Sequence, residues 1–156
     1  MRVRDPAAVN LQGVFDPIAL PGTDAERLLI ITFSPGCPIC AANQPFLAAL
    51  ARDLKNGRGY RVLWLSRDSI KVTRQHCERN NIPMEDVMAE APIRTYRQLG
   101  LDAVPQMFVV KSGGIIDRAW NGRLNAEKLA EISGYFHTNL GARTFSSGNG
   151  RRYAQF

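Results

Sequence analysis

The sequence predicts an α/β fold in which a central mixed β-sheet is flanked by helices on both faces. Two near-continuous apolar runs, at 28–33 and 60–65, are typical of central strands that are buried on both faces. A stretch with helical periodicity follows each of them. Farther along, a strand–glycine turn–strand pattern and a last helix-like stretch predict a hairpin and a closing helix. This order is typical of an α/β sheet that contains both parallel and antiparallel strands.

The composition predicts one domain and a short tail. The chain has 156 residues, of which 45% are hydrophobic, so it can bury a core without disulfide bonds. No run approaches the ~20 apolar residues that a membrane-spanning helix needs. We assign residues 1–140 to the domain and 141–156 to a flexible basic tail with three arginines and no acidic residue. Although the net charge is +6, no Lys/Arg run with interleaved aromatic residues predicts a nucleic-acid groove, and we interpret the tail as a solvated terminus.

The first half of the chain predicts an alternation of strands and helices. Turn residues separate these elements, Pro-Gly-Thr-Asp at 21–24 and Ser-Pro-Gly at 34–36. Ser69 is a typical N-cap residue for the second helix. The expected elements are a short strand at 14–20, a strand at 28–33, a helix at 41–54, a strand at 60–65 and a helix from Ser69 to about residue 80.

The second half predicts two short elements, a hairpin and a final helix. Gly113 and Gly114 supply the backbone conformations that a tight hairpin turn needs. Gly100 stops a preceding short helix, and Asn125 is a typical N-cap residue for the last one. The expected elements are a short strand at 84–88, a short helix at 93–99, strands at 107–110 and 115–120, and a helix from Asn125 to about residue 139.

Two cysteines, Cys37 and Cys40, lie three positions apart where the strand at 28–33 leads into a helix. The unpaired N–H groups and the positive end of that helix stabilise a thiolate on the first cysteine. The pattern predicts a reversible redox pair in which Cys37 attacks a disulfide and Cys40 resolves the mixed disulfide. The intervening Pro38 and Ile39 are expected to tune the redox poise. The N–H groups of Ile39 and Cys40 are expected to point at the Cys37 sulfur.

The same CxxC spacing also occurs in zinc half-sites. Zinc requires about four ligands, and the remaining candidates, Cys77, His76 and His137, show no recognisable ligand spacing. We therefore predict no metal and no other cofactor. His76 and Cys77 are expected to pack in or near the core, because a free cysteine behaves as a small apolar residue.

The motifs around these cysteines resemble those of the thioredoxin fold. Pro45 lies five residues after Cys40, where thioredoxins carry a helix-kinking proline. Pro105, just before the strand at 107–110, matches the cis-proline of the family, and Gly122 matches the glycine after its closing strand. The resemblance covers nearly the whole chain and implies a thioredoxin-like fold.

Two features narrow this resemblance. The strand–helix insertion between residues 65 and 101 looks like the TlpA/ResA branch of thiol–disulfide oxidoreductases, whose members are extracytoplasmic and often tethered to a membrane. The motif Ser-Pro-Gly-Cys-Pro-Ile-Cys at 34–40 is similar to the SPxCPxC motif of MauD-type proteins. The resemblance also implies a cis peptide bond at Pro105. Such a bond leaves the backbone N–H and C=O of Val104 open to pair with an extended substrate segment.

The resemblance implies a thiol–disulfide oxidoreductase that exchanges electrons with protein cysteines through Cys37 and Cys40. Its partners would be a cysteine-containing protein substrate and an upstream electron donor or acceptor, and we expect a monomer. A periplasmic or other extracytoplasmic location is implied, but residues 1–6 show no signal peptide, so an export signal or a membrane tether would lie outside this sequence. A cytoplasmic location is the alternative. A thiol peroxidase and a redox-inert binding or metal-delivery module are the alternative functions, although the Thr and Pro spacing of peroxiredoxins is missing at 34–36.

Three positions depart from the family pattern. Gly36 replaces the tryptophan before the first cysteine, which leaves the approach to Cys37 less shielded. Ile31 occupies the position of the buried aspartate of thioredoxins, and Asn43 that of a glutamate in ResA-type proteins. Asn43 is expected either to form a local hydrogen bond or to lie on the surface of the predicted helix. Cys40 therefore lacks the usual acceptor for its proton. Either water or another carboxylate accepts this proton, or the proton transfer is slow.

Overall fold

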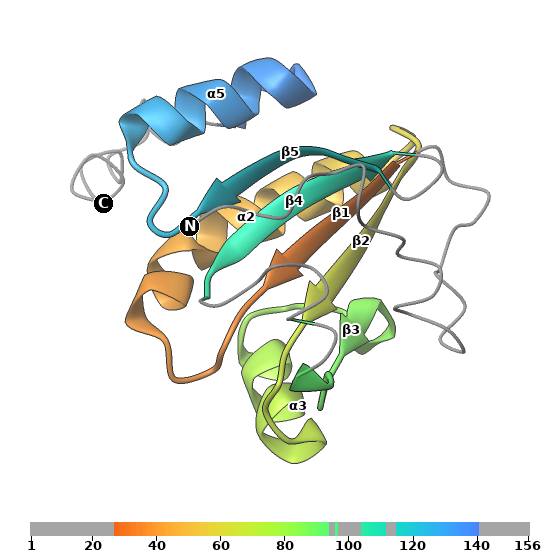
Figure 1. The fold of residues 1–156 in the computed structure, drawn as a ribbon, viewed down its shortest axis with the longest axis vertical. Helices are drawn as coiled ribbons and strands as arrows, with labels where there is room; N and C mark the ends of the chain where they lie inside the picture. The colour runs from red at the N-terminus through yellow and green to blue at the C-terminus, as the bar shows by residue number, and fades with distance from the viewer. Residues whose placement is uncertain (1–26, 94–95, 97–103, 112–114, 141–156) are drawn as a thin grey trace.

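The computed structural model describes residues 27–93, 96, 104–111 and 115–140, and its centre is a five-stranded mixed sheet (Figure 1). The strand order is β3-β2-β1-β4-β5. β1 pairs in parallel with β2 and β2 with β3, whereas the β1–β4 and β4–β5 pairs are antiparallel. The strands are β1 (Arg27–Thr32), β2 (Tyr60–Leu65), β3 (Val87–Met88), β4 (Gln106–Lys111) and β5 (Ile115–Asn121). The predicted mixed sheet is therefore confirmed.

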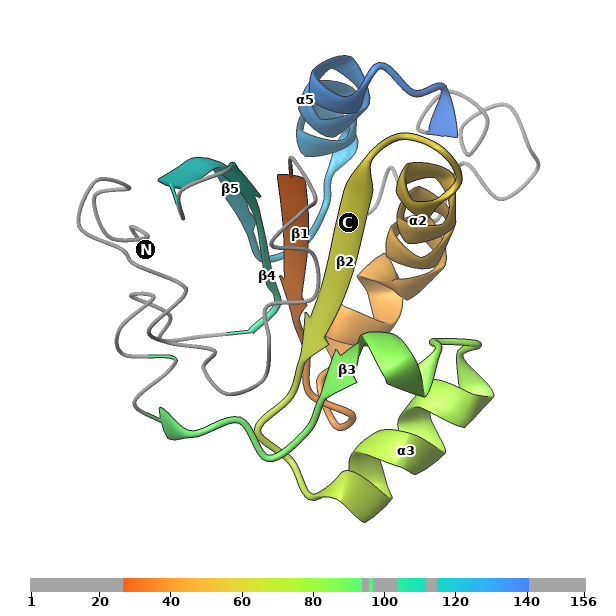
Figure 2. The ribbon, with the colours of Figure 1, turned by 90° about the vertical axis from the view of Figure 1, so that its right-hand side faces the viewer.

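Three α-helices accompany this sheet: α2 (Pro38–Lys55), α3 (Ile70–Arg79) and α5 (Ala126–Phe136). α2 and α3 lie in the connections between parallel strands, because such strands need a crossover and cannot be joined by a tight hairpin turn. α5 follows the β4–β5 hairpin and lies on the same side of the sheet as α2 (Figure 2). Within the described ranges, every helix falls short of the combined length and apolarity that crossing a membrane requires.

Alternating strand residues build two apolar layers, one on each face of the sheet. On the face that the three helices cover, Trp64 of β2 and Val109 of β4 belong to one large cluster. On the opposite face, Ile30 and Phe108 pack with Tyr96, a helical residue of the segment after β3. Helical residues thus contact both faces, as predicted. Burial on both faces also explains why β1 and β2 read as unbroken apolar runs.

Helix α2 begins at Pro38, three residues earlier than predicted. Cys37 is its N-cap residue, and proline is favourable in the first turn because the missing N–H has no intrahelical partner there. The helix continues through Pro45, the predicted kink position, at the cost of one intrahelical hydrogen bond. Its buried residues follow helical spacing and include the large apolar side chains Phe46, Leu47, Leu50 and Leu54.

The predicted strand at 84–88 is only partly a strand. Its first three residues, Met84–Asp86, form a 3-10 helix. Only its last two residues, which make up β3, pair with β2. The turn forms because the Asp86 N–H donates to the carbonyl of Pro83 at 3.0 Å. Proline before the segment favours this turn over an early entry into the sheet.

The last helix ends at Phe136, whereas the sequence predicts an end near residue 139. His137 adopts a left-handed backbone with φ +52°. Its N–H then donates to the carbonyls of Ser133 and Gly134, which closes the helix. The two predicted N-caps are confirmed: the Ser69 and Asn125 side chains accept hydrogen bonds from the first turns of α3 and α5.

Four predicted features lie wholly or partly outside the described residues. They are the strand at 14–20, the hairpin turn at 113–114, most of the helix at 93–99 and the tail at 141–156. The two strands that flank the hairpin turn, β4 and β5, are described and pair in the predicted antiparallel sense.

Replacing Leu50 with alanine should lower the free energy of unfolding by about 2–5 kcal/mol, because the deleted side chain leaves a cavity between α2 and the sheet. The matched control is Val72→Ala on α3, where the residue is 43% exposed and the change should be about 0.5 kcal/mol or less. Urea denaturation followed by circular dichroism measures both variants. Equal losses in the two variants would contradict this assignment of the core.

Candidate active site

Cys37 lies at the N-cap position of α2, in the loop that follows β1. Its sulfur accepts a hydrogen bond from the Cys40 N–H, with an N···S distance of 3.2 Å. Of the two amides expected to point at this sulfur, those of Ile39 and Cys40, the structure assigns the hydrogen bond to Cys40. The first turn of α2 carries no acidic residue, so no charged side chain of that turn opposes a thiolate at the positive end of the helix.

Cys40 is only 4% exposed, whereas Cys37 is partly exposed. Burial raises the pKa of the Cys40 thiol to about 12, and its hydrogen bond with Cys37 acts in the same direction. A backbone hydrogen bond from Ser34 opposes part of this rise in pKa. All three cysteines are free thiols. A molecule that approaches from solvent therefore reaches the Cys37 sulfur more readily than the Cys40 sulfur.

The loop before the cysteines is open at Gly36. A Cβ atom at this position would meet no other atom within 4 Å, and the residue is exposed. The Cys37 N–H donates to the carbonyl of Ser34 at 3.1 Å, which closes the turn. Ile31, by contrast, is buried in the apolar cluster beneath α2, so its position supplies no proton acceptor. The expected open approach to Cys37 agrees with this geometry.

The Val104-Pro105 pair lies at the same end of the sheet as Cys37, because β4 runs antiparallel to β1 and begins beside the end of β1. The peptide bond between the two residues is cis, as the resemblance implied. Pro105 is buried, and its carbonyl accepts a hydrogen bond from the Gly122 N–H at 2.9 Å. Val104 and Cys37 are both half-buried and pack against the same apolar cluster.

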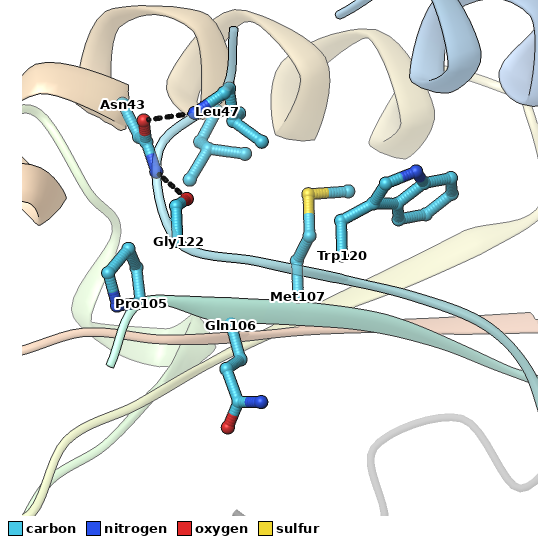
Figure 3. Close-up of a pocket in the computed structure, with 8 residues that line it drawn as sticks. Asn43, Leu47, Pro105, Gln106, Met107, Trp120 and Gly122 are labelled. Atoms are coloured by element: carbon cyan, nitrogen blue, oxygen red, sulfur yellow. Dashed lines mark hydrogen bonds between the residues drawn. The ribbon is translucent and has the colours of Figure 1, made fainter. Parts of the chain in front are cut away.

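A small pocket lies between α2 and the β4–β5 hairpin, next to Pro105 (Figure 3). Asn43 spans it: its Nδ2 donates to the Gly122 carbonyl at 3.0 Å, and its Oδ1 accepts the Leu124 N–H at 3.1 Å. Asn43 is 2% exposed, so the prediction of a helix-surface position is wrong. Asn43 precedes Leu47 by four residues, which places both on the same face of the helix, and this spacing is the signal in the sequence that indicates a buried position. The lining residues are Asn43, Leu47, Pro105, Gln106, Met107, Trp120, Gly122 and Leu124.

A buried polar pair holds the first residue of β4 against β1. The Thr32 hydroxyl accepts the Gln106 N–H at 2.9 Å and donates to the Gln106 carbonyl at 3.2 Å. The Gln106 side-chain amide donates to the Asn121 side chain at 2.7 Å. Neither Thr32 nor Gln106 stood out in the sequence, because their pairing depends on which strands are neighbours.

His76 and Cys77 pack in the core, as predicted. The His76 ring is buried and stacks on Phe33, with the ring centroids 5.3 Å apart. Burial lowers the pKa of His76, and the charge of Arg79 acts in the same direction. Cys77 is fully buried, which raises the pKa of its thiol to about 11. In the part of the chain that the structure describes, no three His, Cys, Asp or Glu side chains come together as a metal site.

Replacing Asn43 with alanine should lower the free energy of unfolding by about 1–3 kcal/mol, because the Leu124 N–H and the Gly122 carbonyl lose their partner in a buried place. The matched control is Gln75→Ala, which removes an exposed amide from α3. Urea midpoints for the two variants provide the comparison. A loss no larger than that of the control would show that Asn43 does not hold α2 to the segment after β5.

The reduced protein should lose stability as the pH rises above about 9. In the folded chain the thiols of Cys40 and Cys77 have pKa values of about 12 and about 11, whereas in the unfolded chain both lose their protons near pH 9. The stabilisation is complete below the unfolded pKa and is lost as the pH rises through the folded values. Urea midpoints between pH 7 and pH 11 with reductant present measure it. Cys77→Ala should decline less steeply, and an unchanged slope would contradict its raised pKa.

Comparison with known proteins gives structural similarity alone. No family model matches the chain, and no curated protein matches its sequence. A proposed thioredoxin from Neisseria meningitidis is 22% identical, with a TM-score of 0.62 over 88% of each chain. A secreted disulfide oxidoreductase from Mycobacterium tuberculosis, described as homologous to DsbE, is 16% identical with a TM-score of 0.58, covering 72% of this chain and 81% of that one. StoA from Bacillus subtilis is 13% identical with a TM-score of 0.57, covering 70% and 83%. The chain therefore has a thioredoxin-like α/β fold.

Proposed function

We propose that this protein is a thiol–disulfide oxidoreductase that exchanges electrons with protein cysteines through Cys37 and Cys40. One observation carries the proposal: a partly exposed sulfur at a helix N-cap is hydrogen-bonded by the amide of a second, buried cysteine. The helix N-terminus favours the thiolate that attacks disulfides. The proposal is also supported by the shared fold, since the similar structure from Mycobacterium tuberculosis is itself described as a disulfide oxidoreductase.

The reaction consists of two thiol–disulfide exchanges. The Cys37 thiolate attacks one sulfur of a substrate disulfide, that S–S bond breaks, and the other substrate sulfur leaves as a thiolate. Cys40 then loses its proton and attacks the Cys37 sulfur, which releases the second substrate thiolate. The products are a Cys37–Cys40 disulfide and a reduced substrate that has gained two electrons. The reverse sequence oxidises a substrate dithiol. Pro38 and Ile39, within the ring that the two cysteines close, tune the balance between these directions.

The substrate segment binds in an extended conformation beside Val104. The backbone N–H and C=O of Val104 pair with the segment, and Pro105 shapes the surface against which it lies. The position of these residues at the end of the sheet that carries Cys37 supports this role. Side-chain contacts in the small pocket next to Pro105 are not required for such pairing, because the main chain supplies the hydrogen bonds.

The partners are a cysteine-containing protein substrate and an upstream electron donor or acceptor, and the protein acts as a monomer. An extracytoplasmic, periplasmic location in the manner of TlpA-like proteins is supported by the secreted similar structure from Mycobacterium tuberculosis. A cytoplasmic location is the alternative. The reduction potential of the Cys37–Cys40 pair decides the direction of electron flow: a value near about −270 mV indicates a reductant, and one near about −120 mV an oxidant.

Cys37→Ser should abolish exchange with a protein disulfide, because the attacking sulfur is lost. Cys40→Ser should instead accumulate a mixed disulfide between Cys37 and the substrate, because the resolving sulfur is missing. Reduction of insulin by the dithiothreitol-reduced protein measures turnover, and mass spectrometry under non-reducing conditions detects the mixed disulfide.

The matched control is Cys77→Ser, which removes a buried cysteine that the reaction does not use and should leave turnover per folded molecule unchanged. Turnover that persists in Cys37→Ser would overturn the assignment of the nucleophile. Peroxide consumption in place of insulin reduction would instead indicate a peroxidase.

A further inference from the structure

Gly36 is the residue before Cys37, and the fold itself does not require a glycine at this position. A fold requires glycine where the backbone adopts a positive φ or where a side chain would clash with a neighbouring segment. Gly57, Gly59 and Gly122 have positive φ angles, whereas Gly36 does not. Apart from its chain neighbours, a Cβ atom at Gly36 would meet no atom within 4 Å. The remaining use of a glycine is to let another backbone approach closely.

Hydrogen bonds hold the turn around Gly36 in place. The Cys37 N–H donates to the carbonyl of Ser34 at 3.1 Å, which makes Gly36 the third residue of a four-residue turn. Such a turn requires glycine in third place only when that residue has a positive φ. The Ser34 hydroxyl donates to the carboxylate of Asp68 at 3.2 Å and so tethers the turn to the segment after β2. The open space over Gly36 is therefore a property of an anchored turn.

The main chain next to the Cys37 sulfur is available to a partner only at Gly36. Cys37 uses its own backbone inside the protein: its N–H donates to Ser34, and its carbonyl accepts the Ala41 N–H at 3.1 Å. Pro38, on the other side, has no N–H. Among the described residues, none hydrogen-bonds to the N–H or the carbonyl of Gly36, which is exposed. Gly36 thus presents a peptide backbone without a side chain beside the sulfur.

Gly36 and Val104 belong to opposite flanks of β1 at one end of the sheet. The turn at 34–37 follows β1 and is tethered to the segment after β2, whereas Val104 precedes β4. β2 and β4 are the two neighbours of β1 in the sheet. An extended segment that pairs with Val104 and brings its sulfur to Cys37 therefore continues toward the turn. A side chain at Gly36 would stand in the path of that segment.

We propose that Gly36 is a specificity-determining residue, which admits the main chain of a protein segment on the flank of Cys37 that lies away from Val104. The inference rests on the proposed function and narrows its substrate class to disulfides whose cysteine lies inside a peptide chain, with residues on both sides. The first exchange keeps its chemistry: the Cys37 thiolate bonds to one substrate sulfur, the S–S bond breaks, and the other sulfur leaves as a thiolate. Gly36 decides which disulfides reach that step in the right orientation.

The test compares two disulfides in a Cys40→Ser background, where only the first exchange occurs. One is bis(2-hydroxyethyl) disulfide, which has no peptide chain, and the other is a pair of identical peptides joined through their central cysteines. Acid quenching and mass spectrometry give the rate at which Cys37 forms each mixed disulfide. Gly36→Leu should slow the reaction with the peptide disulfide about tenfold, within the ~10²-fold that a displacement of about 1 Å can cost. The rate with the small disulfide should stay unchanged.

Gly36→Ala is the second variant, and its loss with the peptide disulfide should be smaller than that of Gly36→Leu. Neither variant should lower the urea midpoint, because the position has room for a side chain and no positive φ. The matched control is Gly134→Leu on α5, since Gly134 also lacks a positive φ and a neighbour within 4 Å of its Cβ position. The next residue, Tyr135, bonds to Arg27 at the start of β1, which is the end of the strand remote from Cys37. This control should leave both rates unchanged.

A peptide-disulfide rate that is the same in Gly36→Leu, Gly36→Ala and the wild type would overturn the inference. Equal losses with both disulfides would also overturn it, because they would indicate a shielded or altered thiol and not a lost contact with a chain. These outcomes leave the proposed function intact, since Cys37 still forms mixed disulfides. A Cys40→Ser protein that forms no mixed disulfide with either probe would instead refute the proposed function.

Discussion

The crossover from β1 through α2 to β2 is the constraint on which the rest of the structure depends. Parallel strands cannot be joined by a tight turn, so a helix must return the chain across one face of the sheet. The N-terminus of α2 is thereby placed at the end of β1, where its unpaired N–H groups meet Cys37. Cys40 lies one turn farther along and faces the layer between helix and sheet. One backbone arrangement therefore makes one sulfur accessible and its partner buried.

A single residue, Gly122, links the other two segments of the site. Gly122 donates its N–H to the carbonyl of Pro105 and accepts a hydrogen bond from Asn43 through its own carbonyl. Its φ of +70° is a conformation that glycine adopts far more readily than other residues. The β4–β5 hairpin, α2 and the Pro105 segment are thus joined at one point. The geometry of Val104 relative to Cys37 follows from this junction and from the pairing of β4 with β1.

Polar and apolar side chains around the cysteine loop join it to neighbouring parts of the fold. Two positions that hold carboxylates in proteins with similar motifs serve packing here, Ile31 in the apolar core and Asn43 as a bridge between segments. The Ser34 hydroxyl, in the loop before the cysteines, donates to the carboxylate of Asp68, which follows β2.

The sequence by itself determined the strands β1 and β2, the caps of α3 and α5, and the placement of two cysteines at the start of a helix, because apolar periodicity, capping and motif spacing are local properties of the chain. The hydrogen-bond partners of Asn43 and Thr32 and the contact between Ser34 and Asp68 were decided only by the tertiary structure. Each of these pairs residues that are distant along the chain, and a polar side chain is buried or exposed according to the partner that the strand order and register bring to it. Local pattern carries no information about that partner.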